Sequence, residues 1–256
     1  SAAIIGNPTK VYDNNTAATL TSANYSLAGF VAGESATVNQ AVGTYDSDNA
    51  GSRIVTASLG AGNYAAGSGT DLANYILPTS ASGAGTITQA VVQVINVFAQ
   101  DKVYDATTAA TLITGGAGLS GVYGGDTVNV VSTGASGTFA TKNVGTDIPV
   151  TATGFTIAGS DAGNYTVLQP VGIFADITKA MIALASVTRV YNATTTVPTT
   201  DSAYTLSGVF AGDAVGVEAA GITGDYADKN VGSNKLVTLT GVALNGADAA
   251  NYSIAT

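Results

Sequence analysis

Four short motifs recur in the same order three times along the chain, and this repetition constrains the fold more than any other feature. Successive copies of a motif lie about 90 residues apart, which is longer than a solenoid repeat and close to the size of one small sandwich domain. In chain order the motifs are KVYD, KVYD and RVYN at 10–13, 102–105 and 189–192; FVAGE, VYGGD and VFAGD at 30–34, 122–126 and 209–213; GTYDSDNAG, GTFATKNVG and GDYADKNVG at 43–51, 137–145 and 224–232; and DLANY, DAGNY and DAANY at 71–75, 161–165 and 248–252. The sequence therefore predicts three tandem copies of one module.

A strand-like segment closes each of the first two copies and marks the module boundaries. TITQA at 86–90 and DITKA at 176–180 run directly into the apolar openings VVQVINVF and MIALASV, with no Gly/Ser or Pro linker between them. We therefore expect modules at 1–90, 91–180 and 181–256, joined stiffly into an elongated rod. The third copy reaches Thr256 before a closing strand, so we expect this module to lack that strand at its C-terminal end.

Strand signals dominate the chain, and helix signals are nearly missing. KLVTLTGVAL at 235–244 and PVTATGFTI at 149–157 alternate apolar with polar residues and are rich in β-branched side chains. Glycine-rich clusters between such segments supply turns, and no stretch carries the apolar stripe of a capped amphipathic helix. The sequence predicts an all-β protein in which each module is a sandwich or a barrel.

The DxxNY motif favours an immunoglobulin-like sandwich, with a β-grasp-like module as the alternative. Its tyrosine stands two residues before an aliphatic residue, and one strand follows, as in the tyrosine corner, where the hydroxyl bonds to backbone upstream. Its aspartate is expected to form an Asx turn. The residues to which we assign these structural roles are Asp71, Tyr75, Asp161, Tyr165, Asp248 and Tyr252.

Composition removes many kinds of chemistry. The chain contains no Cys, His or Trp, which excludes thiolate nucleophiles, histidine acid–base catalysis and zinc sites built from Cys or His. The only glutamates, Glu34 and Glu218, lie in different modules, so we do not expect the carboxylate pair of a glycosidase. With a net charge of −9 and scattered basic residues, a nucleic-acid partner is not expected. The longest apolar stretch, 90–99, is too short to insert into a membrane. We expect neither catalysis nor a cofactor.

Two groups of residues are candidates for a binding site. The tyrosines of the KVYD motifs could form a sugar-binding strip, but a ring at a fixed module position is more often buried with its hydroxyl bonded locally, and we adopt this structural interpretation. The residues concerned are Tyr12, Asp13, Tyr104, Asp105, Tyr191 and Asn192. Asp46, Asp48 and Asn49 form a weak calcium candidate, because the other two modules place Lys142 and Lys229 at the position of Asp48.

At the KVYD motifs the sequence resembles the YDG-type repeats of large bacterial exoproteins, a group that includes filamentous-haemagglutinin-like adhesins exported by two-partner secretion. The resemblance extends over essentially the whole chain. The glycine of the pattern is replaced by Asn14, Ala106 and Ala193. The resemblance implies a secreted protein on the bacterial surface, with a stalk that holds a distal binding region away from the cell; it identifies no ligand.

Two functions follow as hypotheses. The first is a structural spacer of an adhesin or biofilm-matrix protein, whose partners are the neighbouring modules of the same polypeptide. The second is an adhesive module that itself binds polysaccharide or a cell-surface protein. A third module without its last strand would also expose a sheet edge. The N-terminal segment 2–5 of another chain could pair there and produce head-to-tail self-association.

Overall fold

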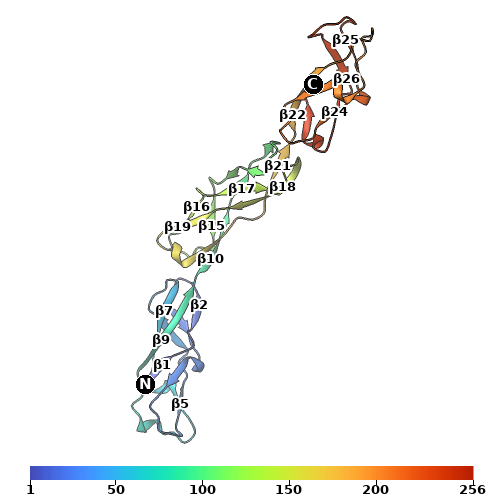
Figure 1. Cartoon of the computed structure of the whole chain (residues 1–256). Coiled ribbons are helices and arrows are strands. Elements are labelled where there is room, and N and C mark those ends of the chain that lie inside the picture. Colours follow the sequence, from blue (N-terminus) through green and yellow to red (C-terminus); the bar gives the residue numbers. More distant parts are fainter. Residues whose placement is uncertain (256) are drawn as a thin grey trace. The chain divides into compact units, whose positions relative to one another are not determined.

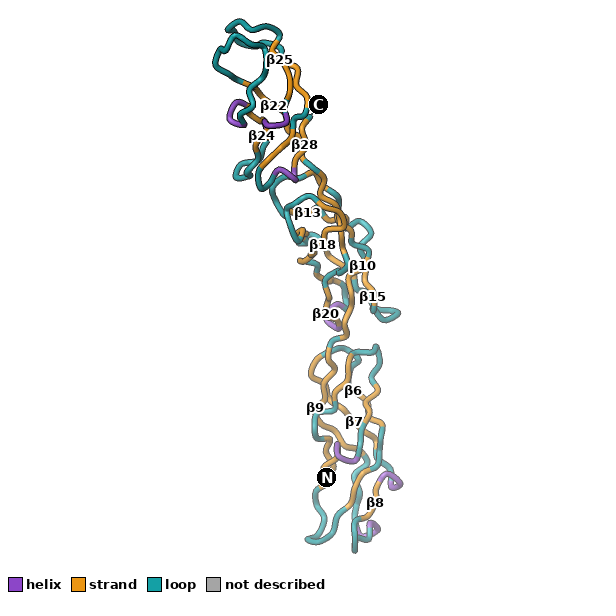
Figure 2. Tube along the Cα trace, turned by 90° about the vertical axis from the view of Figure 1, so that its right-hand side faces the viewer, coloured by secondary structure: helices purple, strands orange, loops and turns teal. Residues whose placement is uncertain are grey.

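The protein is built entirely from strands, turns and short helical turns, as a computed structural model of the chain shows (Figure 1). The structure describes residues 1–255. Strands account for 45% of the residues, and within the described part no helix reaches seven residues. The strands and loops alternate along the whole trace (Figure 2). The predicted all-β class is therefore confirmed.

The described residues form two compact units, each of which contains the junction between two successive repeats. The first unit comprises 1–96, 116–134 and 154–170. The second comprises 97–115, 135–153 and the residues from 171 onward. The second repeat thus contributes to both units.

The first repeat lies wholly in the first unit and is organised around one long strand. Its strands are β1 (Ala2–Ile4), β2 (Thr9–Val11), β3 (Ala17–Thr19), β4 (Tyr25–Leu27), β5 (Ala36–Val38), β6 (Val42–Tyr45), β7 (Gly51–Ser58), β8 (Tyr64–Ala66) and β9 (Ser80–Thr88), with the 3-10 turns η1 (Ser22–Asn24), η2 (Ala61–Asn63) and η3 (Leu72–Asn74). The main sheet has the order β3-β6-β7-β9-β1-β4, and β2 also pairs with β9. β9 runs antiparallel to β7 and parallel to β1 and β2. β5 and β8 form a separate antiparallel pair.

Two glycines let β9 pass close to its neighbours. A Cβ atom on Gly83 would lie 1.9 Å from the carbonyl oxygen of Ile4. One on Gly85 would lie 2.5 Å from a methyl group of Val55. Because real Cβ atoms cannot approach so closely, the sequence GAG in the middle of β9 allows β1 and the Val55 side chain of β7 to lie this close to β9.

The second repeat divides its strands between the two units. In the first unit lie β10 (Ala90–Ile95), β15 (Gly118–Ser120), β16 (Asn129–Val131), β19 (Thr156–Ala158), η4 (Ala162–Asn164) and β20 (Tyr165–Leu168). In the second unit lie β11 (Phe98–Ala99), β12 (Lys102–Val103), β13 (Ala109–Ala110), β14 (Leu112–Ile113), β17 (Ser136–Phe139), β18 (Gly145–Thr153) and β21 (Ile173–Thr178). The larger sheet of this repeat has the order β12-β21-β18-β17-β13, which matches β2-β9-β7-β6-β3 of the first repeat.

The third repeat belongs to the second unit. Its elements are β22 (Ala180–Val187), η5 (Asp201–Ala203), β23 (Tyr204–Ser207), β24 (Gly216–Glu218), η6 (Ala219–Gly221), β25 (Thr223–Tyr226), β26 (Val237–Thr240), β27 (Ala243–Asn245), η7 (Ala249–Asn251) and β28 (Tyr252–Ile254). β22 pairs antiparallel with β23 and parallel with β28, as β10 does with β15 and β20. β25 and β26 form a sheet of only two strands within the described residues.

The segments that close the first two repeats are longer than the sequence motifs indicate. TIT at 86–88 is the end of β9, which begins at Ser80, and DIT at 176–178 is the end of β21, which begins at Ile173. Only Gln89 separates β9 from β10, and only Lys179 separates β21 from β22. The strand that follows the tyrosine of DAGNY, β20, pairs with β10 and not with β21.

The main apolar core of the first unit continues across the junction. Alternation along β7 and β9 buries Val55, Ala57, Ala81 and Ile87. The same cluster also includes Ala90, Val92 and Tyr165 of the second repeat. The first two repeats are therefore joined by shared buried surface as well as by the chain.

Candidate functional site

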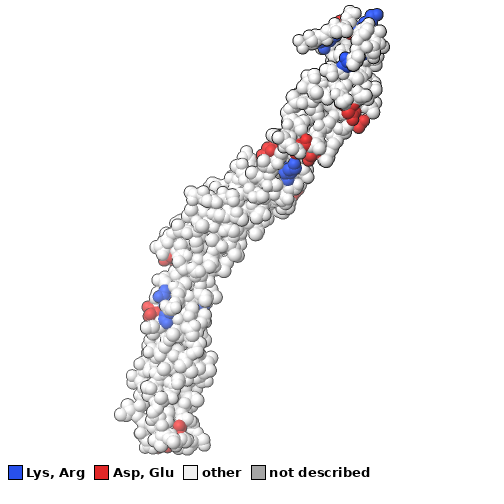
Figure 3. Space-filling model, in the orientation of Figure 1, with Lys and Arg blue, Asp and Glu red and all other residues white. Residues whose placement is uncertain are grey.

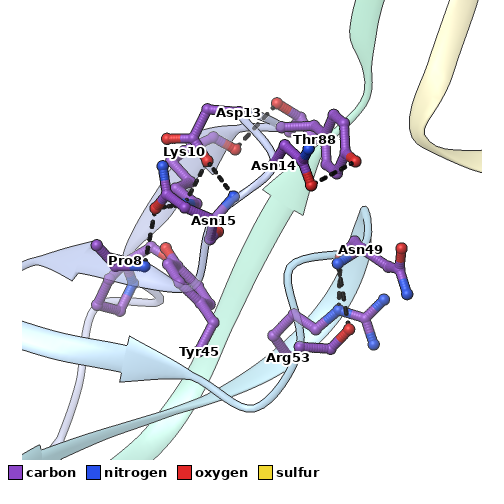
Figure 4. Close-up of polar contacts among 12 residues, drawn as sticks. Pro8, Lys10, Asp13, Asn14, Asn15, Tyr45, Asn49, Arg53 and Thr88 are labelled. Carbon is purple, nitrogen blue, oxygen red and sulfur yellow. Dashed lines mark hydrogen bonds and ion pairs between the residues drawn. The ribbon is translucent and has the colours of Figure 1, made fainter. Parts of the chain in front are cut away.

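The KVYD motif forms a tight loop at the end of the strand that borders the closing strand. Figure 4 shows this loop in the first repeat, where Lys10 reaches across to Asp13 and Asn15. The Lys10 Nζ atom lies 2.6 Å from Asp13 Oδ1 and 2.6 Å from the carbonyl oxygen of Asn15. The backbone N–H of Tyr12 donates to the carbonyl oxygen of Thr88 at 2.8 Å. The lysine thus closes the loop, and the pairing with β9 fixes the direction of the tyrosine.

The residue after the motif has left-handed backbone in all three repeats. The φ angles are +58° at Asn14, +62° at Ala106 and +63° at Ala193. This is the position of the glycine in the YDG pattern, and glycine adopts that conformation without strain. The loop therefore keeps its shape although this chain has no glycine there.

Replacing Ala106 by glycine is expected to stabilise the protein. Holding a residue with a Cβ atom in the left-handed region costs about 1–2 kcal/mol, and glycine avoids this cost. Part of the gain is lost again, because glycine gives up more backbone entropy on folding than alanine does. We expect Ala106→Gly to raise the free energy of unfolding by about 0.5–1 kcal/mol, measured by urea denaturation. Ala110→Gly, within β13, is the matched control and should lower it. A destabilising Ala106→Gly would contradict this account of the loop.

In the first unit, the tyrosine of the KVYD loop meets the next repeat at a carboxylate. The Tyr12 hydroxyl donates to Asp126 Oδ2 at 2.8 Å, and the Tyr165 hydroxyl donates to the same oxygen at 2.5 Å. The Tyr165 oxygen also accepts the backbone N–H of Tyr123 at 2.9 Å. The rings of Tyr12 and Tyr165 pack edge to face, with centroids 5.3 Å apart. Three recurring motifs therefore meet at one point, the first from one repeat and the other two from the next.

The second unit contains the same arrangement between the second and third repeats. The hydroxyls of Tyr104 and Tyr252 donate to Asp213 Oδ2 at 2.7 and 2.6 Å. The Tyr252 oxygen accepts the backbone N–H of Phe210 at 3.1 Å. The two tyrosine rings again lie edge to face, with centroids 5.3 Å apart. Two independently described units thus show one junction geometry.

The asparagine of DxxNY brings the fourth motif into each junction. Asn164 Oδ1 accepts the backbone N–H of Ala50 at 2.8 Å, and its Nδ2 donates to Asn49 at 3.0 Å. Asn251 bonds to Val144 and Asn143 in the same way, at 2.9 and 3.2 Å. Asn164 and Asn251 are each 4% exposed. Both asparagines therefore hold the GTY/GTF loop of the preceding repeat.

Removing one of these amides should weaken its junction. Asn164→Ala leaves the partly buried N–H of Ala50 without an acceptor, which costs about 1–3 kcal/mol. We expect a loss of that size in urea unfolding, together with faster amide exchange at Ala50. Asn74→Ala, at the equivalent but exposed position of the first repeat, is the control and should cost less than about 0.5 kcal/mol. Equal costs for the two variants would contradict the role of Asn164.

A lysine adds an ion pair to the second junction only. Lys142 Nζ lies 2.9 Å from Asp213 Oδ1 and 3.9 Å from Asp248 Oδ1. In the first repeat the corresponding residue is Asp48. The Asp213 side chain is 2% exposed, and hydrogen bonds from Tyr252, Lys142 and Tyr104 lower its pKa from 3.8 to about 2. Burial, followed by the hydrogen bond to Asp213, raises the pKa of Tyr252 to about 12.

The low pKa of Asp213 predicts acid sensitivity of the second junction. Because the folded-state pKa is below the ordinary value of 3.8, the stabilisation is complete above that pH and is lost as the pH falls towards about 2. The shift corresponds to about 2 kcal/mol. We expect urea midpoints to fall in this window and Asp213→Asn to reduce the fall. A wild-type profile that Asp213→Asn leaves unchanged would contradict the assignment.

The outer two repeats each carry one half of a junction. In the first repeat, the hydroxyl of Tyr75 contacts Glu34 and accepts the backbone N–H of Val31, as Tyr165 does from Tyr123. In the third repeat, Tyr191 is 53% exposed, whereas Tyr12 and Tyr104 are 2% and 1% exposed. The first repeat therefore carries the tyrosine and carboxylate side of a junction, and the third repeat carries the KVYD-type loop. Neither has a neighbouring repeat to meet in the described residues.

The aspartates of DxxNY bind backbone next to the junction carboxylates. Asp161 and Asp248 accept the backbone N–H groups of Thr127 and Ala214, at 2.8 and 2.9 Å. Asp71 instead accepts the N–H of Ala73 within its own turn, at 3.0 Å. Asp105 forms an ion pair with Lys102 at 2.7 Å, and Asp13 forms the equivalent pair with Lys10. In the third repeat, Asn192 Oδ1 accepts the backbone N–H of Thr194 at 3.2 Å.

Polar groups of the DSDN loop are engaged in hydrogen bonds within the first repeat. Asp46 Oδ1 accepts the backbone N–H of Ile54 at 3.1 Å. The guanidinium of Arg53 donates to the carbonyl oxygens of Asn49 and Ala50 at 2.7 and 2.9 Å (Figure 4). Arg53 thus holds two backbone carbonyl oxygens of this loop. Across residues 1–255, no group of three or more acidic, His or Cys side chains is placed to hold a metal.

Sequence reasoning did not single out four residues of the junctions: Asp126, Asp213, Asn164 and Asn251. It also did not predict that Lys142 pairs with Asp213. All of them lie within the recurring motifs, so their repetition was the available signal. What the motifs do not state is that they pair between repeats. Within residues 1–255, no helix has the length and apolar character needed to span a membrane.

Comparison with known proteins gives one family. The family model described as YDG domain matches the chain three times, at residues 1–83, 88–172 and 177–256. Neither the curated proteins nor the solved structures contain a match to this chain.

Proposed function

Because the chain belongs to the YDG domain family along nearly its whole length, we propose that it is a non-catalytic spacer segment of a bacterial surface adhesin or matrix exoprotein. In this role it lies outside the cell and carries a distal binding region away from the surface. Its immediate partners are the neighbouring repeats of its own polypeptide.

One observation carries this proposal: all four recurring motifs meet at the junctions between repeats. Binding proteins place their recurrent polar and aromatic residues in an open site, where a ligand can reach them. Here the hydroxyls of Tyr12 and Tyr104 instead donate hydrogen bonds to Asp126 and Asp213 of the next repeat. What the repeats have in common is therefore the means of attachment to one another, which is the property that a spacer requires.

The surface is also consistent with a spacer. Figure 3 shows few charged side chains on the visible face, and those present include both signs. Charged residues make up 10% of the chain, so most of the surface is uncharged. The chain has only two arginines, Arg53 and Arg189, and arginine is one of the side chains that most often anchor a tightly bound protein partner.

The proposal is tested by using the chain as a spacer. A known carbohydrate-binding domain is displayed on cells through this chain, and capture of beads is measured against a polymer coat of increasing thickness. We expect the domain carried on the chain to capture beads through coats that prevent capture by the same domain displayed without the chain. The Tyr12→Ala/Tyr104→Ala variant of the chain should lose this advantage. Equal capture by both would overturn the proposal. Retention of the free chain on cells, matrix or a glycan array would support the adhesive-module hypothesis in its place.

A further inference from the structure

The third repeat has an open place where the first two repeats each hold a strand. β9 lies between β7 and β2, and β21 lies between β18 and β12. In the third repeat β26 corresponds to β7 and β18, and residues 188–191 correspond to β2 and β12. Within the described residues, no strand lies between these two segments.

A groove of about 640 Å³ occupies this place. Its lining includes Leu184, Val187, Tyr226, Val237 and Leu239. These five side chains are half-buried and pack against the core of the repeat. The groove is therefore floored by apolar residues of the kind that the closing strands cover in the other repeats.

The two walls of the groove already have the geometry of the filled repeats. The guanidinium of Arg189 lies 4.6 Å from the ring centroid of Tyr226. Lys10 and Tyr45 form the equivalent contact at 5.5 Å in the first repeat. The Tyr226 hydroxyl also donates to the carbonyl oxygen of Val187, at 3.4 Å. The walls thus stand in register without the strand, so a strand could enter with little rearrangement.

The backbone of 188–191 is exposed where its counterparts pair. In the first two repeats the N–H groups of Tyr12 and Tyr104 donate to Thr88 and Thr178 of the closing strand, both at 2.8 Å. Tyr191 has no such strand beside it in the described residues, and Val190 is 89% exposed. This segment therefore offers a row of backbone groups to an incoming strand.

We propose that this groove binds a β-strand with the sequence pattern of Ile173–Thr178, parallel to residues 188–191 and antiparallel to β26. The occupant carries aliphatic side chains at alternate positions, as Ile173, Ala175 and Ile177 do, and these fill the apolar floor. The backbone pairing supplies affinity, and the alternate side chains fix the register. The partner is thus an extended peptide segment of the closing-strand type.

A second copy of this chain is a poorer occupant. The N-terminal segment 2–5 was considered from the sequence, but its residues Ala2–Ile4 form β1, which is already paired with β4 and with β9 in its own repeat. Strands β9 and β21 are likewise held in their own sheets. A donor from a second copy would have to leave its own sheet first.

The test uses the full chain and the synthetic peptide IFADITKA, which is residues 173–180. We expect saturable one-to-one binding, with amide shifts at Arg189, Tyr191 and Val237 and none at Val55 of the first repeat. The control is the same peptide with aspartate in place of Ile177. It should bind at least about tenfold more weakly, because the charged side chain would have to enter the apolar floor of the groove. Absence of binding at about 1 mM peptide, or equal binding of both peptides, would overturn the proposal.

Two proline variants separate strand pairing from general stickiness. The pattern in β2 shows that the N–H groups of Lys10 and Tyr12 face the closing strand, whereas that of Val11 faces away. Tyr191→Pro should therefore weaken peptide binding at least about tenfold, whereas Val190→Pro should not. Equal effects would contradict the proposed direction of pairing. Concentration-dependent dimerisation that excludes the peptide would overturn the proposal in favour of a second copy.

Discussion

Replacing Tyr104 by alanine is expected to lower the free energy of unfolding of the second unit by about 3–5 kcal/mol. The ring is 1% exposed, and its hydroxyl donates to Asp213. Its removal leaves a cavity between the second and third repeats and takes one donor from a buried carboxylate. Tyr12→Ala should have a comparable effect in the first unit, where the ring is 2% exposed. The measurement is urea unfolding followed by amide exchange in each unit.

The third repeat supplies the matched control for this prediction. Tyr191 stands at the same position of the motif but is 53% exposed and lies at no described junction. Tyr191→Ala should therefore change the free energy of unfolding by less than about 0.5 kcal/mol. If the three tyrosine variants had equal effects, the tyrosine would serve its own loop, and its assignment to the junction would be wrong.

Replacing Asp213 by alanine is expected to cost about 3–5 kcal/mol, and more than the same change at Asp126. Both substitutions leave two tyrosine hydroxyls without their acceptor, but Asp213→Ala also removes the closer of the two carboxylates that pair with Lys142 and leaves only the 3.9 Å contact with Asp248. The Lys142 side chain keeps some contact with water, so the cost should lie at the lower end of that range.

A double-mutant cycle isolates the ion pair within this cost. Lys142→Met alone should destabilise less than Asp213→Ala, and the two changes together should be less than additive. Asp105→Ala, which breaks the exposed ion pair with Lys102, is the control for the loss of a paired carboxylate away from the junction acceptor and should cost about 1 kcal/mol or less. Additive losses for Lys142 and Asp213 would contradict direct coupling between them.

The class of fold and the repetition could be predicted from the sequence because both are local properties. Alternation in segments such as 149–157 specifies a strand regardless of its partner, and the order of four motifs specifies a repeat. The length of β9 was harder to predict, because Ser80–Gly85 is made of small residues with little apolar alternation. These residues are a strand because two glycines let neighbouring strands approach closely, which is a tertiary effect.

The junctions were out of reach of sequence reasoning for a related reason. A tyrosine at a fixed place in a repeat predicts a buried ring, but Tyr12 and Asp126 are 114 residues apart, and nothing local states that they meet. The position of the KVYD loop at the end of β2 decides this, since that end faces the next repeat. The lysine that strengthens the second junction shows the same limit, because only its spatial neighbour Asp213 distinguishes Lys142 from Lys229.

The central claim is that successive repeats are held in a fixed geometry by these junctions, and spin-label distances measure it directly. The chain has no cysteine, so labels can be placed at Thr151→Cys and Ser207→Cys, two exposed positions on either side of the junction in the second unit. Pulsed electron–electron double resonance should give one narrow distance distribution, which broadens when Tyr104→Ala is added. A broad distribution in the unaltered junction, or a narrow one that survives Tyr104→Ala unchanged, would contradict the account.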